Sequence, residues 1–141
     1  MIPDVIQQKI LIVKNCLHQI RTTTELNPNT LDVQLIQDAF VLNLQRAVQA
    51  AIDIASFICS RQDFGIPDTY KKSFDLLQQN RIIPASLATS MKALWGFRNI
   101  AVHDYQKINP DILKSILTKE LFDLETFYLE VISFYEERPV Q

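Results

Sequence analysis

The chain has 141 residues, of which 48% are hydrophobic and 21% charged, and its formal net charge is −2; this length is typical of one compact domain. Two widely separated glycines exclude the glycine-rich phosphate loop and the dinucleotide-binding fingerprint, and two cysteines with two histidines are too few for a paired-cysteine zinc site or a disulfide framework. No signal peptide and no membrane-spanning run is recognisable, so we expect a soluble protein of a reducing cytoplasm, with no membrane association.

Six prolines divide the chain into five segments in which apolar residues recur every three or four positions, and each segment is predicted to be a helix. The expected helices cover about 4–24, 31–60 and 68–79, followed by one with Pro84 in its first turn and one long C-terminal helix with Asn109 as N-cap and Pro110 at its first position. No segment alternates as a strand does. We therefore predict an all-α, up-and-down bundle of about five helices, forming a single domain over 1–141, with an unstructured tail after Arg138.

Positive charge is concentrated in the middle of the chain. Residues 61–107 carry seven Lys and Arg against four Asp and Glu, a net charge of +3, whereas residues 1–60 carry −1 and residues 108–141 carry −4. An excess of this size could attract nucleic acid, and it is also compatible with an ordinary soluble surface. The aromatic residues of this region are interpreted as packing residues, not as a platform for bases: Tyr70, Phe74, Trp95 and Phe97.

A narrow polar row crosses the otherwise apolar helix predicted over 31–60. Its members recur at steps of three and four: Asn43, Arg46, Gln49, Asp53, Ser56 and Ser60. A solvent-facing stripe is the simpler interpretation. The row lacks the Lys and Glu that are typical of such a face, however, so Arg46 and Asp53 could instead support a site between helices.

The densest group of reactive side chains lies in residues 96–105. Arg98 and His103 are five residues apart, which is about 140° around an ideal helix, so both can face one ligand only if the helix ends or distorts near His103. Asp104 and Pro110 favour such an end. The alternative without a functional site is that His103 caps the carbonyls at the helix end and that Arg98 forms a surface ion pair with Asp104.

Arg98, His103 and Tyr105 form a pattern that resembles the RxxxxHxY signature of the HEPN superfamily, and specifically of the HepT toxins of bacterial HepT/MntA toxin–antitoxin pairs. The residue after the arginine is typically polar in the superfamily, and here it is Asn99. Similar segments follow in the same order from about 31 to 135: 42–55, 73–77, 96–99 and 102–105. The resemblance implies a helical homodimer in which two copies of the motif face each other across a cleft, and it implies cleavage of RNA without a metal or another cofactor.

The residue types suit that reaction. RNA cleavage without a metal requires a base for the 2′-hydroxyl, an acid for the leaving 5′-oxygen and a cation for the charge that develops on phosphorus. Histidine side chains titrate near pH ~6.5, so His103 of one subunit can serve as base and its counterpart in the dimer as acid. Arg98 would hold the phosphate with its fork of donors, and Asn99 would bind phosphate or orient His103.

The resemblance also implies a partner and a modification. In the family, the MntA nucleotidyltransferase antitoxin transfers AMP from ATP to the motif tyrosine, which is Tyr105 in this sequence, and the added bulk and negative charge silence the toxin. We therefore expect an endoribonuclease toxin that is neutralised by AMPylation. Two alternatives remain. The chain could be a non-catalytic HEPN module that binds a nucleotidyltransferase or a nucleotide through Arg98 and His103, or a helical protein in which the motif is coincidental.

Overall fold

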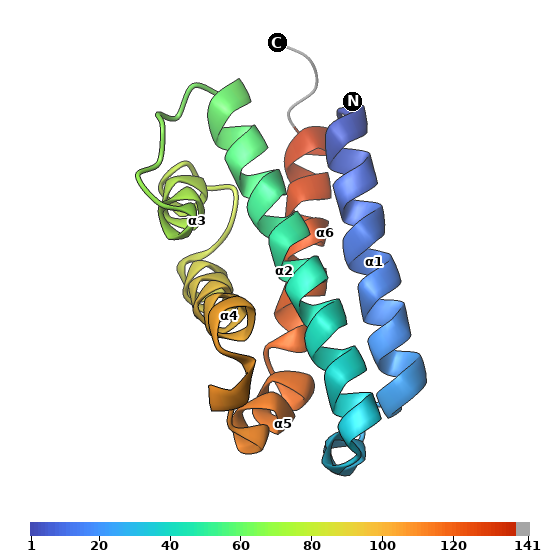
Figure 1. Cartoon of the computed structure of the whole chain (residues 1–141). Helices are drawn as coiled ribbons and strands as arrows, with labels where there is room; N and C mark the ends of the chain where they lie inside the picture. Colours follow the sequence, from blue (N-terminus) through green and yellow to red (C-terminus); the bar gives the residue numbers. More distant parts are fainter. Residues whose placement is uncertain (138–141) are drawn as a thin grey trace.

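Helices account for all the regular structure in the computed structural model, which describes residues 1–137 (Figure 1). Six α-helices and two short 3-10 helices follow one another: α1 (Asp4–Thr24), η1 (Pro28–Asp32), α2 (Gln34–Arg61), α3 (Tyr70–Gln79), α4 (Ala85–His103), η2 (Tyr105–Lys107), α5 (Pro110–Thr118) and α6 (Leu121–Glu137). No strand occurs within these residues, which confirms the predicted all-α class. The tail predicted after Arg138 lies outside the described residues.

The central helix of the bundle is α2. Figure 1 shows α1, α2 and α6 side by side along the length of the molecule, with α3 and α4 on the opposite side of α2 from α1. Because neighbours cover α2 on several sides, its buried residues are not confined to one stripe: Ile58 is 0% exposed, and Val41 and Ile52, which lie on a different face of the helix, are 1% and 0% exposed. None of the helices in residues 1–137 combines the length and the apolar character needed to cross a membrane.

Local capping residues set where several helices begin. Oδ1 of Asn109 accepts a hydrogen bond from the backbone N–H of Asp111 at 2.8 Å, and Pro110 occupies the first position of α5, as predicted. The Thr69 side chain caps α3, so this helix starts two residues after the predicted position. Pro84 lies one residue before α4 and not in its first turn, and α2 starts three residues later than predicted because η1 precedes it.

The prediction of one long C-terminal helix was wrong, because the helix is interrupted between α5 and α6. Lys119 has φ −125° and ψ −74°, and its N–H still donates to the carbonyl of Ser115 at 3.0 Å. The next two bonds close tighter turns, from the N–H of Phe122 to the carbonyl of Lys119 at 3.4 Å and from the N–H of Asp123 to the carbonyl of Glu120 at 3.0 Å. The break lets α5 pack against η1 while α6 packs against α1, α2 and α4. One straight helix could not reach both sets of neighbours.

Candidate active site

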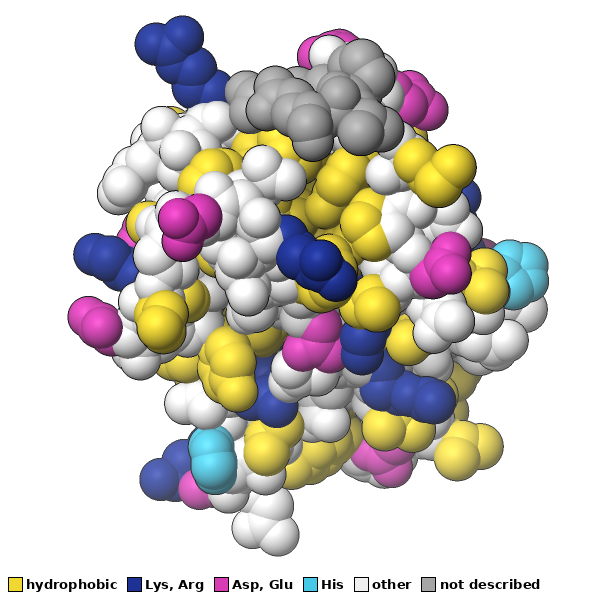
Figure 2. Space-filling model, turned by 90° about the horizontal axis from the view of Figure 1, so that it is seen from above, with side chains coloured by type: hydrophobic (Ala, Val, Ile, Leu, Met, Phe, Trp, Pro, Cys, Tyr) yellow, Lys and Arg dark blue, Asp and Glu magenta, His cyan; other side chains and the backbone are white. Residues whose placement is uncertain are grey.

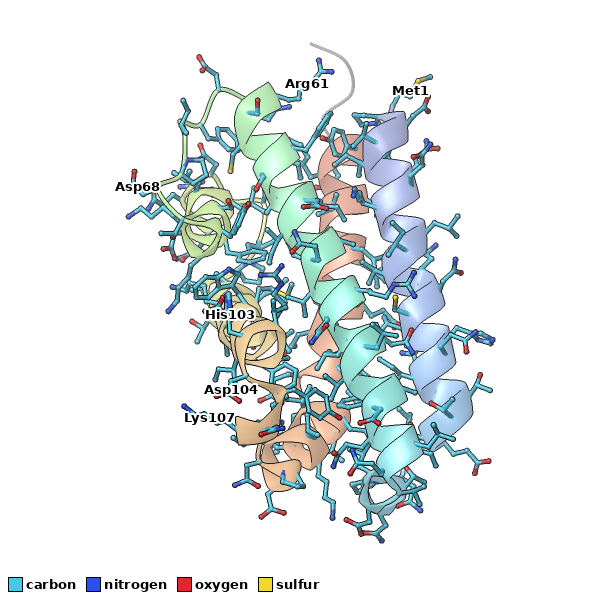
Figure 3. The ribbon with its side chains drawn as sticks, viewed as in Figure 1. Met1, Arg61, Asp68, His103, Asp104 and Lys107 are labelled. Carbon is cyan, nitrogen blue, oxygen red and sulfur yellow. The ribbon has the colours of Figure 1, made fainter. Side chains whose placement is uncertain are left out.

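An open pocket of about 740 Å³ lies between α4 and the loop that leads into α3. We call it the α3–α4 pocket, and it is lined by Ser56 of α2, by Ile66, Pro67, Asp68, Thr69 and Tyr70, and by Trp95, Arg98, Asn99 and His103 of α4. Figure 3 shows the labelled Asp68 and His103 on the same side of the molecule, away from α1. Among residues 1–137, no three His, Cys, Asp or Glu side chains are grouped so that they could hold a metal ion.

The end of α4 brings the two motif residues to this pocket. Helical geometry stops at His103, because Asp104 has φ −154° and ψ 76° while its N–H still donates to the carbonyl of Ile100 at 2.7 Å. His103 is exposed in the last turn, and the half-buried Arg98 side chain reaches the pocket from five residues earlier. The geometric condition for one shared ligand is therefore met, and the catalytic roles of both residues stay predictions.

The guanidinium of Arg98 is not neutralised by a carboxylate. The surface pair considered between Arg98 and Asp104 does not form, because Asp104 lies 3.3 Å from Nζ of Lys107. None of the ion pairs among residues 1–137 involves Arg98. A half-buried arginine without an acidic partner retains its charge and its donors for an anion that enters the pocket.

The loop between α2 and α3 forms one wall of the pocket, and the sequence analysis did not identify it. Gly65 has φ 106°, a left-handed conformation that glycine adopts without strain; the chain then turns back toward α4. The interpretation of four aromatic residues as packing residues holds for Phe74 and Phe97, which are buried. It also holds in part for Trp95, which packs against the core but lines the pocket too, whereas Tyr70 is 53% exposed and lines the pocket. Nζ of Lys71 lies 5.9 Å from the centre of the Trp95 ring.

Most of the polar row on α2 lies away from the pocket. Asp53 faces α1, where its carboxylate lies 2.9 Å from Nζ of Lys9, and Gln49 donates to its other oxygen at 2.9 Å. The charge of Arg46 acts on the α1 side as well, where it lowers the pKa of the Cys16 thiol, although burial has the larger effect and raises it. Neither Arg46 nor Asp53 is among the described residues that line the α3–α4 pocket, whereas Ser56 of the same row is.

Tyr105 lies in η2, two residues after His103, and its ring is half-buried. Its hydroxyl donates a hydrogen bond to Oδ1 of the exposed Asp38 in α2. Burial first, then the hydrogen bond and the charge of Asp38, raise the pKa of Tyr105 to about 12. Hydrogen bonds from Tyr105 and Gln34 in turn lower the pKa of Asp38. The sequence analysis missed Asp38, because no motif links it to a residue 67 positions later.

An all-helical bundle in which an arginine and a histidine from the end of one helix share an open pocket is the arrangement that the HEPN resemblance implies. The family model described as "Ribonuclease HepT-like" matches residues 13–131. The chain therefore belongs to the HepT-like ribonuclease family. This confirms the resemblance seen in the sequence, and with it the predicted class of enzyme, a ribonuclease.

Individual relatives agree with this assignment. The chain is 40% identical over 124 residues to the "mRNA nuclease HepT" of Shewanella oneidensis, an alignment that covers 88% of this chain and 93% of the relative. The tri-AMPylated HEPN toxin of Shewanella oneidensis, solved in complex with MNT antitoxin, is 38% identical and superposes with a TM-score of 0.88 over 94% of this chain and 99% of that chain. A toxin–antitoxin structure with AMP-PNP gives 38% identity and a TM-score of 0.86, over 93% and 99% of the two chains.

Proposed function

We propose that the chain is the endoribonuclease toxin of a HepT/MntA-type pair, that it cleaves RNA at the α3–α4 pocket without a metal, and that AMPylation of Tyr105 by a nucleotidyltransferase antitoxin neutralises it. The observation that carries this proposal is the pairing of an arginine without an acidic partner and an exposed histidine in one open pocket of a HepT-like ribonuclease. A cytoplasmic location, where RNA is available, is part of the same proposal.

The pocket residues divide the chemistry between them. Arg98 holds the scissile phosphate and stabilises the negative charge that develops on it, because a guanidinium is always charged and offers paired donors. His103 moves the proton between the 2′-hydroxyl, the leaving oxygen and solvent. Asn99, which lines the same wall, binds phosphate or orients His103. Tyr70 and Trp95 offer ring faces on which bases can stack.

A homodimer supplies the second histidine that the reaction requires. One α3–α4 pocket contains His103 as its only histidine among the residues that line it, so an acid and a base of the same kind must come from two copies. Exposed apolar side chains surround this end of α4: Ile66 is 96% exposed, and Ile100 and Val102 are each 50% exposed. Such residues at the rim of a polar pocket are suited to a second copy of the chain.

The antitoxin part of the proposal depends on the relatives and on the position of Tyr105. A similar toxin is AMPylated and binds MNT antitoxin, and Tyr105 matches the tyrosine of the family motif. Its side chain lies on the segment that immediately follows His103. A phosphodiester attached there would add negative charge close to a site that must bind RNA phosphate, and like charges repel.

Arg46 and Asp53 lie on the α1 side, so support from them would act through the packing of α2.

One assay separates this proposal from a non-catalytic HEPN module. Purified, unmodified chain is incubated with cellular RNA in the presence of EDTA, and wild type is compared with His103→Ala. We expect cleavage that resists the chelator and is lost in the variant. A dimeric, unmodified wild-type chain that leaves RNA intact would instead support the module that binds a nucleotidyltransferase or a nucleotide through Arg98 and His103.

A further inference from the structure

The hydroxyl of Tyr105 is hydrogen-bonded to a carboxylate. It donates to Oδ1 of Asp38, in the N-terminal part of α2. Nε2 of Gln34, one turn earlier on α2, donates to the same oxygen at 2.8 Å. The Tyr105 ring is half-buried and Asp38 is exposed, so the pair lies at the surface, where a second protein can reach it. The oxygen of Tyr105 to which AMP would be attached in the proposed function is thus already hydrogen-bonded to a carboxylate.

Asp38 has no cationic partner, in contrast to Asp104 and Asp32, two other aspartates around this end of the bundle. Asp104 is paired with Lys107 at 3.3 Å, and Asp32 is paired with Lys114 at 2.7 Å. None of the ion pairs among residues 1–137 includes Asp38, and the two side chains that donate to it are neutral. Its negative charge therefore acts on the Tyr105 hydroxyl without compensation by a neighbouring lysine or arginine.

We propose that Asp38 is a catalytic residue of the nucleotidyl transfer, which accepts the proton of Tyr105 while the tyrosine oxygen attacks the α-phosphorus of a nucleoside triphosphate. A bond forms between Oη of Tyr105 and the α-phosphorus. The bond from that phosphorus to the oxygen that bridges to the β-phosphate breaks, and pyrophosphate leaves with the electron pair. The proton passes from Oη to Oδ1 of Asp38. This inference rests on the proposed function, in which Tyr105 is AMPylated.

The phenol needs a base because it does not ionise in advance. With a pKa of about 12, Tyr105 is fully protonated at neutral pH, so its proton must leave during the attack. Asp38 is a carboxylate at that pH, because the ordinary pKa of an aspartate is already near 3.8 and hydrogen bonds from Tyr105 and Gln34 lower it further. A base already in hydrogen-bond contact with the attacking oxygen meets the geometric requirement for general-base catalysis. The toxin chain thereby contributes a group to its own inactivation.

The same geometry implies that the modified side chain leaves Asp38. Once Oη is esterified it has no proton to donate, and the phosphodiester places a negative charge beside an unpaired carboxylate. Both changes remove the attraction between η2 and α2 at this point. Modification therefore weakens the attachment to α2 of the segment that directly follows His103.

The test compares rates of AMP addition in variants of the full chain. Wild type, Asp38→Asn, Asp38→Glu and Asp32→Asn are each mixed with the nucleotidyltransferase of the neighbouring reading frame and MgATP, and intact mass is followed over time. Asn keeps an oxygen acceptor at a similar position but takes up no proton, so we expect about a 10²-fold slower transfer, the order of a general-base effect. Glu should restore part of the rate, and Asp32→Asn, which removes a paired surface aspartate, should match wild type.

The pH dependence distinguishes proton transfer from a structural role. In Asp38→Asn the rate should rise about tenfold per pH unit between about pH 7 and 9, because the phenolate becomes the nucleophile, while wild type varies much less. An Asp38→Asn variant that is modified at the wild-type rate, or that is slow but has the wild-type pH profile, overturns the inference. Tyr105→Phe tests the proposed function separately, since a Phe variant that still receives AMP places the modification elsewhere, whatever Asp38 does.

Discussion

His103 and His18, the two histidines of the chain, lie on opposite sides of the protein: His103 ends α4 and His18 is on α1, and both are exposed (Figure 2). This separation provides a matched pair of variants for the nuclease proposal. We expect His103→Ala to lower chelator-resistant RNA cleavage about 10²- to 10⁴-fold, the usual contribution of a general acid or base. His18→Ala should cleave RNA at the wild-type rate. The measurement is the initial rate on a labelled RNA in EDTA.

The fold should survive both substitutions, because each removes an exposed side chain. Equal helical content and equal melting temperatures, measured by circular dichroism, would establish this. If both variants lost cleavage equally, or if neither did, the assignment of His103 as the proton-transfer residue would be wrong.

Arg98→Lys tests whether the fork of donors matters in addition to the charge. Lysine keeps the positive charge but offers a single ammonium group, so it cannot hold a phosphate in the two-point manner of a guanidinium. We expect a loss of about 10²-fold in the rate of cleavage, similar to removal of one donor to a transition state. The control is Arg61→Lys, at the end of α2, where the guanidinium lies over the Phe57 ring and outside the α3–α4 pocket. Full activity of Arg98→Lys would reduce the role of Arg98 to charge alone.

The Tyr105–Asp38 contact should contribute to stability only within a window of pH. The pKa of Asp38 is lowered from 3.8, so its contribution is present above about pH 4 and is lost as the pH falls further. The pKa of Tyr105 is raised from 10.0 to about 12, so its contribution is complete below pH 10 and is lost as the pH rises toward 12. Melting temperatures of wild type and Asp38→Asn should therefore differ near neutral pH and converge at both extremes.

A spectroscopic titration checks the same contact directly. Phenolate absorbance should show one tyrosine of wild type that ionises at a higher pH than in Asp38→Asn, because the variant lacks the carboxylate that disfavours the phenolate. Tyr105→Phe should lack this transition altogether. Identical titration curves for wild type and Asp38→Asn would contradict the contact.

Local sequence rules predicted those parts of the fold that depend on neighbouring residues. The spacing of apolar residues located the helices, and Asn109 with Pro110 marked the start of α5, because a cap acts within one turn of the chain. The break at Lys119 could not be predicted, because neither glycine nor proline marks it and its cause is the packing of α5 against η1. The role of Asp38 could not be predicted from the sequence either, because its contact with Tyr105 depends on how α2 and η2 pack.

The core offers a test of the fold that is independent of the site. Phe127 of α6 is fully buried, and its ring meets that of Phe74 of α3 edge to face, with centroids 5.7 Å apart. Phe127→Ala should lower the free energy of unfolding by about 3–5 kcal/mol, because it removes buried apolar surface and leaves a cavity. Phe122 lies on the same helix but is 44% exposed, so Phe122→Ala should cost much less, about 1 kcal/mol or below. Urea unfolding followed by circular dichroism measures both values. Similar losses in the two variants would contradict the packing of α6 against α3.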